Sequence, residues 1–308
     1  MGPLSFLVVR FLLIINPAAG RHRAGERGAE LLQRLERAGH VCTVEETLGP
    51  GHATVLAASG ARSHDAVVAI GGDGTLHEVL SGLVQPGAEQ LAPLGLVPAG
   101  SGDSLAMDLG IADVAGAALR LLAGELRTID LARVDFFEDL GDAAPTQTRY
   151  AANVLAWGAG ARINRRAEGM RWAGAQRYNV ATIVELIQMG RGTCAAKIDG
   201  QVFADDLLGV ASLTRFSGRG LQLAPRAQLS DGYIDLVQIK RMSRLQLARI
   251  FSAVFRGAHL SHKGVEWRHA QSLTLELGPT GELVVDGELL TCSAARITVE
   301  CDRLQIFS

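Results

Sequence analysis

The sequence lacks the features that mark disulfide-stapled, membrane-spanning and nucleic-acid-binding proteins. Its four cysteines form no C-x-x-C pair and have no histidine at zinc-ligand spacing, which argues for reduced thiols in a cytosolic protein. With 30 basic and 32 acidic side chains, the net charge is −2, so the chain as a whole does not attract nucleic acid. The longest apolar stretch, residues 5–15, is interrupted by Arg10; we expect a soluble protein with only peripheral membrane contact.

What the sequence has in excess is glycine. Its 36 glycines fall in clusters, 48% of its residues are hydrophobic, and 308 residues is a natural length for two domains. Because glycine permits tight turns and a close approach of the backbone to a ligand, the glycine clusters are the first candidates for a binding site.

Residues 1–130 alternate apolar, strand-like runs with helical patterns. The runs lack the polar alternation of a half-exposed sheet, which indicates a parallel sheet covered by helices on both faces. In such sheets ligands bind at the carboxyl ends of the strands. The expected strands are Phe11–Ile15, Val41–Glu46, Ala66–Ile70 and Leu94–Val97, and the expected helices are Glu26–Ala38, His52–Ser59, Leu76–Leu83 and one starting at Ser104–Leu109.

Residues 131–308 change to many short alternating segments, which is typical of a β-rich, largely antiparallel sandwich. We expect this second domain to begin after a first domain of residues 1–130, and its extreme C-terminus could return to that first domain. The polar stretch Glu138–Thr148 predicts a hairpin loop. The expected strands are Tyr150–Leu155, Ala195–Ile198, Leu207–Leu213, Ile234–Ile239, Ser272–Leu277, Glu282–Val285 and Arg296–Val299, with helices at Arg177–Met189 and Leu245–Phe255.

The strongest motif, GGDGT at residues 71–75, lies between a buried strand and a helix. Glycines there let backbone N–H groups approach phosphate oxygens, and the helix N-terminus adds positive potential. A carboxylate beside phosphates needs a cation or a proton-transfer task, so Asp73 is a candidate catalytic residue. The alternative is that Asp73 is the N-cap of the helix.

Four motifs in order resemble those of the diacylglycerol kinase catalytic-domain superfamily, which includes bacterial diacylglycerol kinases, sphingosine kinases and ceramide kinases. They are NPAAG (16–20), GGDGTLHEVLSGL (71–83), PAGSGDSLA (98–106) and DGE (286–288). The resemblance implies an α/β nucleotide-binding catalytic domain followed by a β-sandwich lipid-substrate domain, with the active site between them. It also implies ATP and Mg²⁺ as cofactors and a lipid substrate at the membrane surface.

Carried over by motif, the resemblance implies nucleotide contacts in both domains. Guanidinium groups bind phosphate oxygens in bidentate fashion, which suits Arg171 and Arg177; the alternative for Arg171 is a solvated surface charge. The implied nucleotide contacts are Asn16, Thr47, Gly71, Gly72, Gly74, Thr75, Ser101, Arg171, Arg177, Asp286 and Gly287.

The motifs PAGSGDSLA and NVLAWG (153–158) resemble the sphingosine and ceramide kinase branch more than the bacterial one. Yet where sphingosine kinases place an aspartate that holds the sphingoid ammonium, this sequence has Asn164, two residues after Arg162. An amide cannot form that ion pair but hydrogen-bonds hydroxyl or amide groups. The substrate is therefore a neutral lipid such as diacylglycerol or ceramide, or a sphingoid base held elsewhere, with Asp103 and Asn164 as expected substrate contacts.

The segment LSDGYID (229–235) is similar to a structural magnesium motif of the bacterial branch. The resemblance implies as ligands the Asp231 side chain and the backbone carbonyls of Gln228 and Tyr233, oxygen donors that suit Mg²⁺. An Asp-Gly pair is also the signal of a type I′ hairpin turn, so a hairpin is the alternative, and the two are compatible.

The mechanism implied by the resemblance is transfer of the ATP γ-phosphoryl group to a primary lipid hydroxyl, with a carboxylate that accepts the proton. Asp73 and Glu288 are the candidates; we favour Asp73 as the base and Glu288 as a magnesium ligand or second carboxylate. The rival functions are a soluble kinase of the NAD kinase type and a catalytically inactive lipid- or nucleotide-binding module.

A lipid groove in the second domain is a further hypothesis; for its Thr182–Met189 stretch, core packing is the alternative. We expect a cytoplasmic enzyme peripherally associated with the membrane, and the sequence leaves its oligomeric state open. The expected groove residues are Leu155, Trp157, Ile183, Ile187 and Met189.

Overall fold

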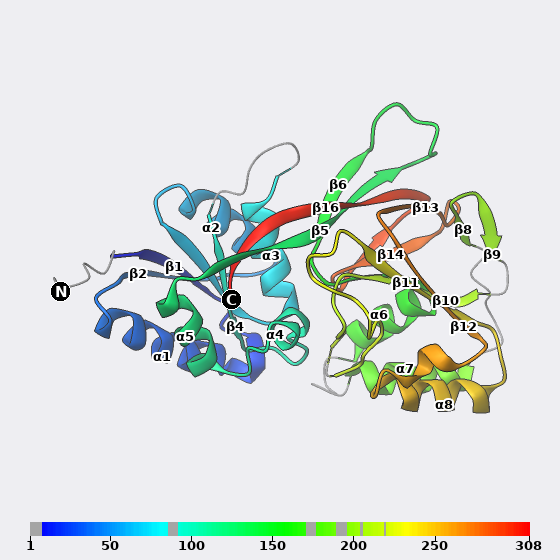
Figure 1. The fold of residues 1–308 in the computed structure, drawn as a ribbon, viewed down its shortest axis with the longest axis horizontal. Coiled ribbons are helices and arrows are strands. Elements are labelled where there is room, and N and C mark those ends of the chain that lie inside the picture. The colour runs from blue at the N-terminus through cyan, green and yellow to red at the C-terminus, as the bar shows by residue number, and fades with distance from the viewer. Residues whose placement is uncertain (1–7, 86–91, 171–176, 189–195, 204–205, 219) are drawn as a thin grey trace. The chain divides into compact units, whose positions relative to one another are not determined.

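The computed structural model describes residues 8–85, 92–170, 177–188, 196–203, 206–218 and 220–308, which form two compact units (Figure 1). Unit 1 comprises residues 1–129 and 303–308, and unit 2 comprises residues 130–302. Strands β5 (Leu126–Phe137) and β16 (Ala294–Phe307) each run through both units. The chain therefore enters unit 2 on one strand and returns to unit 1 on another.

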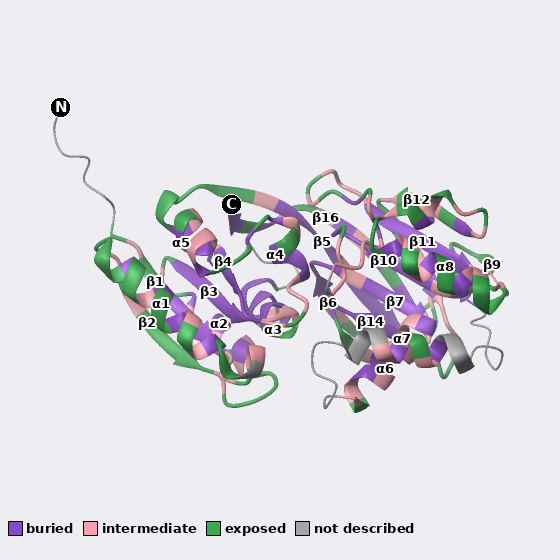
Figure 2. Ribbon diagram, turned by 90° about the horizontal axis from the view of Figure 1, so that it is seen from below, coloured by how far each residue is buried: buried purple, intermediate pink, exposed green. Residues whose placement is uncertain are grey.

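Unit 1 is built on a parallel sheet in the order β2-β1-β3-β4. Strands β1 (Arg10–Ile15), β3 (Ala66–Gly71) and β4 (Leu94–Pro98) are almost wholly buried (Figure 2), as central strands between helix layers are. The expectation of continuous burial is wrong for β2 (Val41–Glu46), an edge strand whose side chains are mostly exposed. The end of β16 pairs with β4 in parallel.

Amphipathic helices pack against this sheet. In α1 (Ala24–Arg37), Leu31 and Leu35 lie one turn apart and are fully buried, because positions four apart share one helix face. The predicted elements miss α5 (Val114–Ala123), although its cap is visible in the sequence: Asp113 accepts a hydrogen bond from the Gly116 N–H at 2.8 Å. The other helical elements are η1 (Ala19–His22), α2 (His52–Gly60), α3 (Asp73–Leu83) and α4 (Ser104–Asp108).

Unit 2 is a β-sandwich, so the predicted fold class, an α/β parallel-sheet domain plus an antiparallel sandwich, is confirmed. One antiparallel sheet has the order β12-β11-β10-β7-β14-β15; side chains from both sheets share a core around the fully buried Trp157. A Cβ on Gly209 would lie 2.0 Å from the Trp157 ring, so only glycine fits there. The strands of this sheet are β7 (Val154–Gly158), β10 (Asp206–Ser212), β11 (Ile234–Lys240), β12 (Val265–Ala270), β14 (Glu282–Val285) and β15 (Glu288–Thr291).

The facing sheet contains one correction to the predicted strands. The predicted strand Tyr150–Leu155 is two strands, because β6 ends at Ala151 and β7 begins at Val154. The predicted loop Glu138–Thr148 does connect β5 to β6, which pair antiparallel. The remaining elements are β6 (Gln147–Ala151), β8 (Ala196–Ile198), β9 (Gln201–Phe203), β13 (Ser272–Glu276), α6 (Ala159–Gly169), α7 (Arg177–Gln188), α8 (Arg244–Val254) and η3 (Ala258–Ser261).

No helix in the described part of the chain is long and apolar enough to cross a membrane. Cys42, Cys292 and Cys301 are free thiols, while Cys194 lies outside the described residues. Burial raises the pKa of Cys292 to about 12, so this thiol is unreactive at neutral pH.

Candidate functional site

The three glycine-rich motifs of unit 1 form one site at the carboxyl end of its parallel sheet. They follow β1, β3 and β4, which are neighbours in that sheet. The Asn16 N–H donates to the Ile70 carbonyl at 3.0 Å, and the Ala99 N–H donates to the Gly71 carbonyl at 2.7 Å. The Asn16 side chain reaches α3, since its Nδ2 donates to Thr75 Oγ1 at 2.9 Å. The predicted nucleotide contacts Asn16, Gly71 and Thr75 are thus brought together.

Two of these loops approach so closely that side chains are excluded. A Cβ on Gly100 would lie 2.5 Å from the Cα of Gly72 and 2.7 Å from Asp103 Oδ1. The bare backbone adjoins the N-terminus of α3, whose N–H groups carry positive potential. Such a combination of exposed backbone and helix N-terminus is suited to binding phosphate.

Asp73 is the first residue of α3, and the N-cap position is Gly72. The alternative in which Asp73 is the N-cap is therefore wrong. Asp73 Oδ1 accepts a hydrogen bond from the Ser104 N–H at 2.7 Å, and Oδ2 accepts one from the Ser104 hydroxyl at 3.3 Å. The carboxylate thus joins the start of α3 to the start of α4 and is fixed in position by the loop that follows β4.

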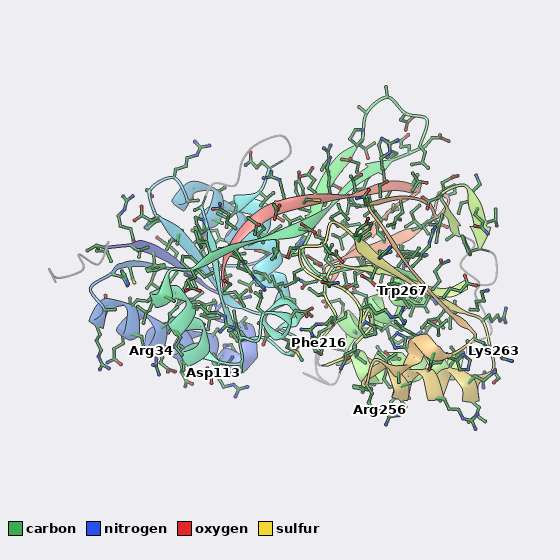
Figure 3. The ribbon with its side chains drawn as sticks, viewed as in Figure 1. Arg34, Asp113, Phe216, Arg256, Lys263 and Trp267 are labelled. Atoms are coloured by element: carbon green, nitrogen blue, oxygen red, sulfur yellow. The ribbon has the colours of Figure 1, made fainter. Side chains whose placement is uncertain are left out.

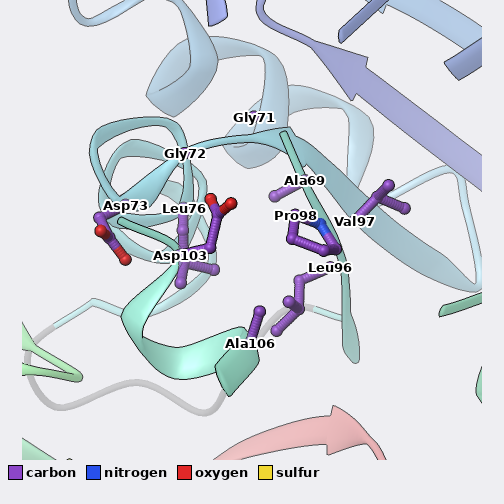
Figure 4. Close-up of a pocket in the computed structure, with 10 residues that line it drawn as sticks. All are labelled: Ala69, Gly71, Gly72, Asp73, Leu76, Leu96, Val97, Pro98, Asp103 and Ala106. Carbon is purple, nitrogen blue, oxygen red and sulfur yellow. The ribbon is translucent and has the colours of Figure 1, made fainter. Parts of the chain in front are cut away.

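Asp103 holds the other side of that loop. Its backbone is left-handed, with φ 54°, and its Oδ1 accepts a hydrogen bond from the Gly100 N–H at 2.9 Å. Asp73 and Asp103 line one pocket, on the side of α3 and α4 and opposite Leu96 of β4 (Figure 4). Carboxylates beside a phosphate-binding loop suit Mg²⁺, which takes one or two carboxylates together with phosphates and waters.

Three more predicted nucleotide contacts lie in unit 1, and the side chains of the two predicted arginine contacts lie outside the described residues. Thr47 directly follows β2, and its N–H donates to the Ile15 carbonyl at 2.8 Å. Gly74, in the first turn of α3, and Ser101, on the loop after β4, are both exposed. Arg171 lies outside the described residues, as does the side chain of Arg177, the first residue of α7. The phosphate contacts of both arginines stay predictions.

A second group of predicted residues gathers in unit 2, at the turn between β14 and β15. Asp286 and Gly287 form this turn with φ values of 47° and 94°, as a type I′ hairpin requires. The buried Asp286 carboxylate accepts backbone hydrogen bonds from the N–H groups of Ala152 (2.8 Å), Asn153 (3.0 Å) and Val154 (2.8 Å). Asp286 therefore fastens the turn to the start of β7, and its contact with the nucleotide stays a prediction.

Asn164 of α6 contacts the same turn. Its Nδ2 donates to the Gly287 carbonyl at 3.0 Å, while its buried Oδ1 has no hydrogen-bond partner among the described residues. Glu288 is exposed at the first position of β15. Arg162 pairs with Glu185 of α7 at 2.6 Å, so its charge is compensated between the two helices. The structure thus brings Asn164, Gly287 and Glu288 together within unit 2.

The predicted magnesium motif lies in a turn directly before β11. Apart from one isolated bridge, the described residues between β10 and β11 contain no strand, so the hairpin alternative is wrong. Asp130 accepts from the Gly232 N–H at 2.7 Å, and Asp231 Oδ1 accepts from the Tyr233 N–H at 3.0 Å. No group of three or more His, Cys, Asp or Glu among the described residues is placed to hold a metal. The predicted magnesium site has only one such side chain, Asp231, together with the backbone carbonyls of Gln228 and Tyr233. It therefore stays a prediction.

The predicted lipid groove is wrong for its two residues on β7. Leu155 and Trp157 are fully buried in the sandwich core, so neither side chain lines a groove. Ile183 of α7 is 49% exposed. The side chain of Ile187 and all of Met189 lie outside the described residues.

Glycine loops and carboxylates at the end of a parallel sheet, in a chain that continues into a β-sandwich, define a kinase fold of the NAD kinase and diacylglycerol kinase type. Two solved structures share the fold. A diacylglycerol kinase from Bacillus anthracis str. Sterne has a TM-score of 0.73 at 20% identity and covers 98% of both chains. Yeast NADH kinase has a TM-score of 0.51 at 12% identity, over 99% of this chain and 87% of the other.

Sequence comparison identifies the family. Residues 10–134 match the diacylglycerol kinase catalytic domain, and residues 153–308 match the YegS C-terminal NAD kinase beta sandwich-like domain. A diacylglycerol kinase of Mycobacterium tuberculosis is 32% identical over 95% of this chain and 93% of its own, and one of Bacillus subtilis is 28% identical over 91% and 89%. The chain belongs to the diacylglycerol kinase catalytic-domain family, so the predicted family and the prediction of a lipid kinase, a phosphotransferase, are confirmed.

Proposed function

We propose that the protein transfers the γ-phosphate of ATP to the primary hydroxyl of a neutral lipid, diacylglycerol. The observation that carries this proposal is the Asp73 carboxylate held between two phosphate-binding glycine loops by the Ser104 N–H and hydroxyl. The relatives named diacylglycerol kinase, which align with almost the whole chain, support the lipid class. The enzyme works in the cytoplasm and contacts the membrane only peripherally.

The proposed reaction gives each residue of the site one task. The lipid hydroxyl oxygen bonds to the γ-phosphorus while the bond from that phosphorus to the bridging oxygen breaks, ADP leaves, and the hydroxyl proton passes to Asp73. The backbone around Gly72 and Gly100 binds the phosphates. Mg²⁺, when bound, would neutralise charge on the phosphates, and Glu288 is the carboxylate that the resemblance assigns to it. Asp103, which the resemblance assigns to the substrate, is a second carboxylate suited to hold this ion.

Asn164 supports a lipid substrate with a neutral headgroup. Its amide offers no charge to a sphingoid ammonium, and its Nδ2 already donates a hydrogen bond to the Gly287 carbonyl. Its buried Oδ1 lacks a partner among the described residues. Such an acceptor costs about 1–3 kcal/mol, and a functional contact is one explanation for it. We assign this oxygen to a hydroxyl of the lipid.

The test is label transfer from radioactive ATP to a panel of acceptors: diacylglycerol, ceramide, sphingosine and NAD. We expect label in the lipid extract with diacylglycerol and none in NAD. NAD is the necessary competitor because the fold is shared with yeast NADH kinase. Labelled NAD product with unlabelled lipids would replace the proposal by a soluble nucleotide kinase, and no label in any acceptor would indicate an inactive binding module.

A further inference from the structure

The segment from residue 241 to residue 264, which contains α8 and η3, has a charge unlike that of the rest of the chain. It carries five cationic side chains and no Asp or Glu, which leaves 25 cationic against 32 acidic side chains elsewhere, a net charge of −7. The cations are Arg241, Arg244, Arg249, Arg256 and Lys263, and all five are exposed.

The inner face of α8 is fixed to unit 2. Leu247, Ile250 and Val254 are buried, in one apolar cluster with Val237 and Ile239 of β11. Ser243 begins the helix with a reciprocal capping box with Gln246, which satisfies free backbone N–H groups at that end. The helix is therefore a rigid part of the sandwich unit, and only its outer face is available to a partner.

That outer face combines cations with large apolar side chains. Leu245 is 63% exposed and Phe255 is 38% exposed. Arg249 lies one turn after Leu245 on the same side of α8, and Phe255 directly follows the last residue of the helix. Phe255 packs edge-to-face on Phe251, with ring centroids 5.4 Å apart. Arg256 and Lys263 point away from the body of the unit (Figure 3). We call the surface made of Leu245, Arg249, Phe255 and Arg256 the α8 face.

We propose that the α8 face docks on a lipid bilayer that contains anionic lipids. A helix with basic residues beside exposed leucine and phenylalanine lies in the membrane interface, its apolar side chains among the acyl chains and its cations at the anionic headgroups. Because the rest of the chain has a net charge of −7, an anionic surface favours approach through the α8 face, which also selects the orientation of unit 2. The choice of a lipid surface over an acidic protein rests on the proposed function, whose substrate resides in a bilayer.

Sedimentation with vesicles tests the inference without ATP or turnover. Each basic side chain near an anionic leaflet contributes about a fivefold factor in partition. Arg249→Gln/Arg256→Gln should therefore bind vesicles of phosphatidylcholine with phosphatidylglycerol about 25-fold more weakly than wild type. Wild type should bind pure phosphatidylcholine weakly. Leu245→Ser should bind anionic vesicles more weakly than wild type, and its remaining binding should keep the same dependence on salt.

The matched control removes the same two charges elsewhere. Arg37 and Arg62 are exposed on unit 1, and Arg37→Gln/Arg62→Gln should bind anionic vesicles as wild type does. Equal losses in the two double variants, or unchanged binding of the α8 variant, overturn the proposal, as does a wild type that sediments equally with both kinds of vesicle. Because this experiment measures vesicle binding and no reaction, it tests the membrane-docking proposal separately from the proposed kinase activity.

Discussion

Asp73→Asn should lower kcat by about 10²–10⁴-fold while ATP binding changes little, because the substitution removes the proton acceptor and retains a hydrogen-bond acceptor. The structure makes this a specific test. The amide oxygen of the variant can still accept from the Ser104 N–H, the shorter of the two contacts that Asp73 makes with Ser104, so the loop after β4 keeps its anchor. Steady-state rates with diacylglycerol and ATP titration by calorimetry measure the two quantities.

Ser104→Ala is the control for Asp73. It removes the hydroxyl contact of 3.3 Å and leaves the N–H contact of 2.7 Å, so we expect less than about a tenfold change in kcat, the scale of one neutral hydrogen bond. Near-normal turnover of Asp73→Asn would show that Asp73 is not the base and that its role is only structural, connecting α3 to α4. Glu288 would then become the favoured base.

Asp286→Asn should destabilise unit 2 by about 1–3 kcal/mol, the cost of leaving a buried hydrogen-bonding group without its partner. The carboxylate accepts three consecutive backbone N–H groups. An amide presents one acceptor oxygen, and its NH₂ group would face backbone donors. The tryptophans are Trp157, Trp172 and Trp267, all within unit 2, so urea unfolding followed by tryptophan fluorescence reports on the affected unit.

The same substitution at an exposed turn of unit 2 separates this effect from a general one. Asp139 accepts a single N–H, that of Gly141, at 2.8 Å, and asparagine forms such turns as well as aspartate does. Asp139→Asn should therefore leave the stability of unit 2 unchanged. If Asp286→Asn unfolds at the same urea concentration as Asp139→Asn, the three backbone contacts contribute nothing measurable, and the turn that carries Glu288 is held by other means.

The parts of the fold that could be predicted are those in which local pattern and tertiary structure agree. Buried β-branched strands, amphipathic α1 and glycine clusters between strand and helix are all local signals, and they were enough to predict the parallel sheet and the site at its carboxyl end. Helix α5 was not predicted, although the sequence contains a helix-start signal for it: Asp113, an N-cap residue, directly precedes the helix.

The rest depends on contacts between residues far apart in the chain. Nothing near Asp73 indicates that Ser104, 31 positions away, is its hydrogen-bond donor. The break between β6 and β7 exists because the N–H groups at 152 and 153 turn toward Asp286, more than 130 positions later. The groove predicted at Leu155 and Trp157 was wrong because the sequence pattern of an apolar strand is the same in a core and in a binding site. Only contacts with distant residues distinguish the two.

The most direct test of the account is the ratio of kcat/KM for diacylglycerol to that for sphingosine, measured with wild type in matched mixed micelles. An amide at Asn164, whose Nδ2 is committed to the Gly287 carbonyl, gives an ammonium no counter-charge, so we expect diacylglycerol to be preferred by about tenfold or more, equivalent to about 1.4 kcal/mol. A preference of that size for sphingosine would contradict the account: the substrate would then be the sphingoid base that PAGSGDSLA and NVLAWG suggest.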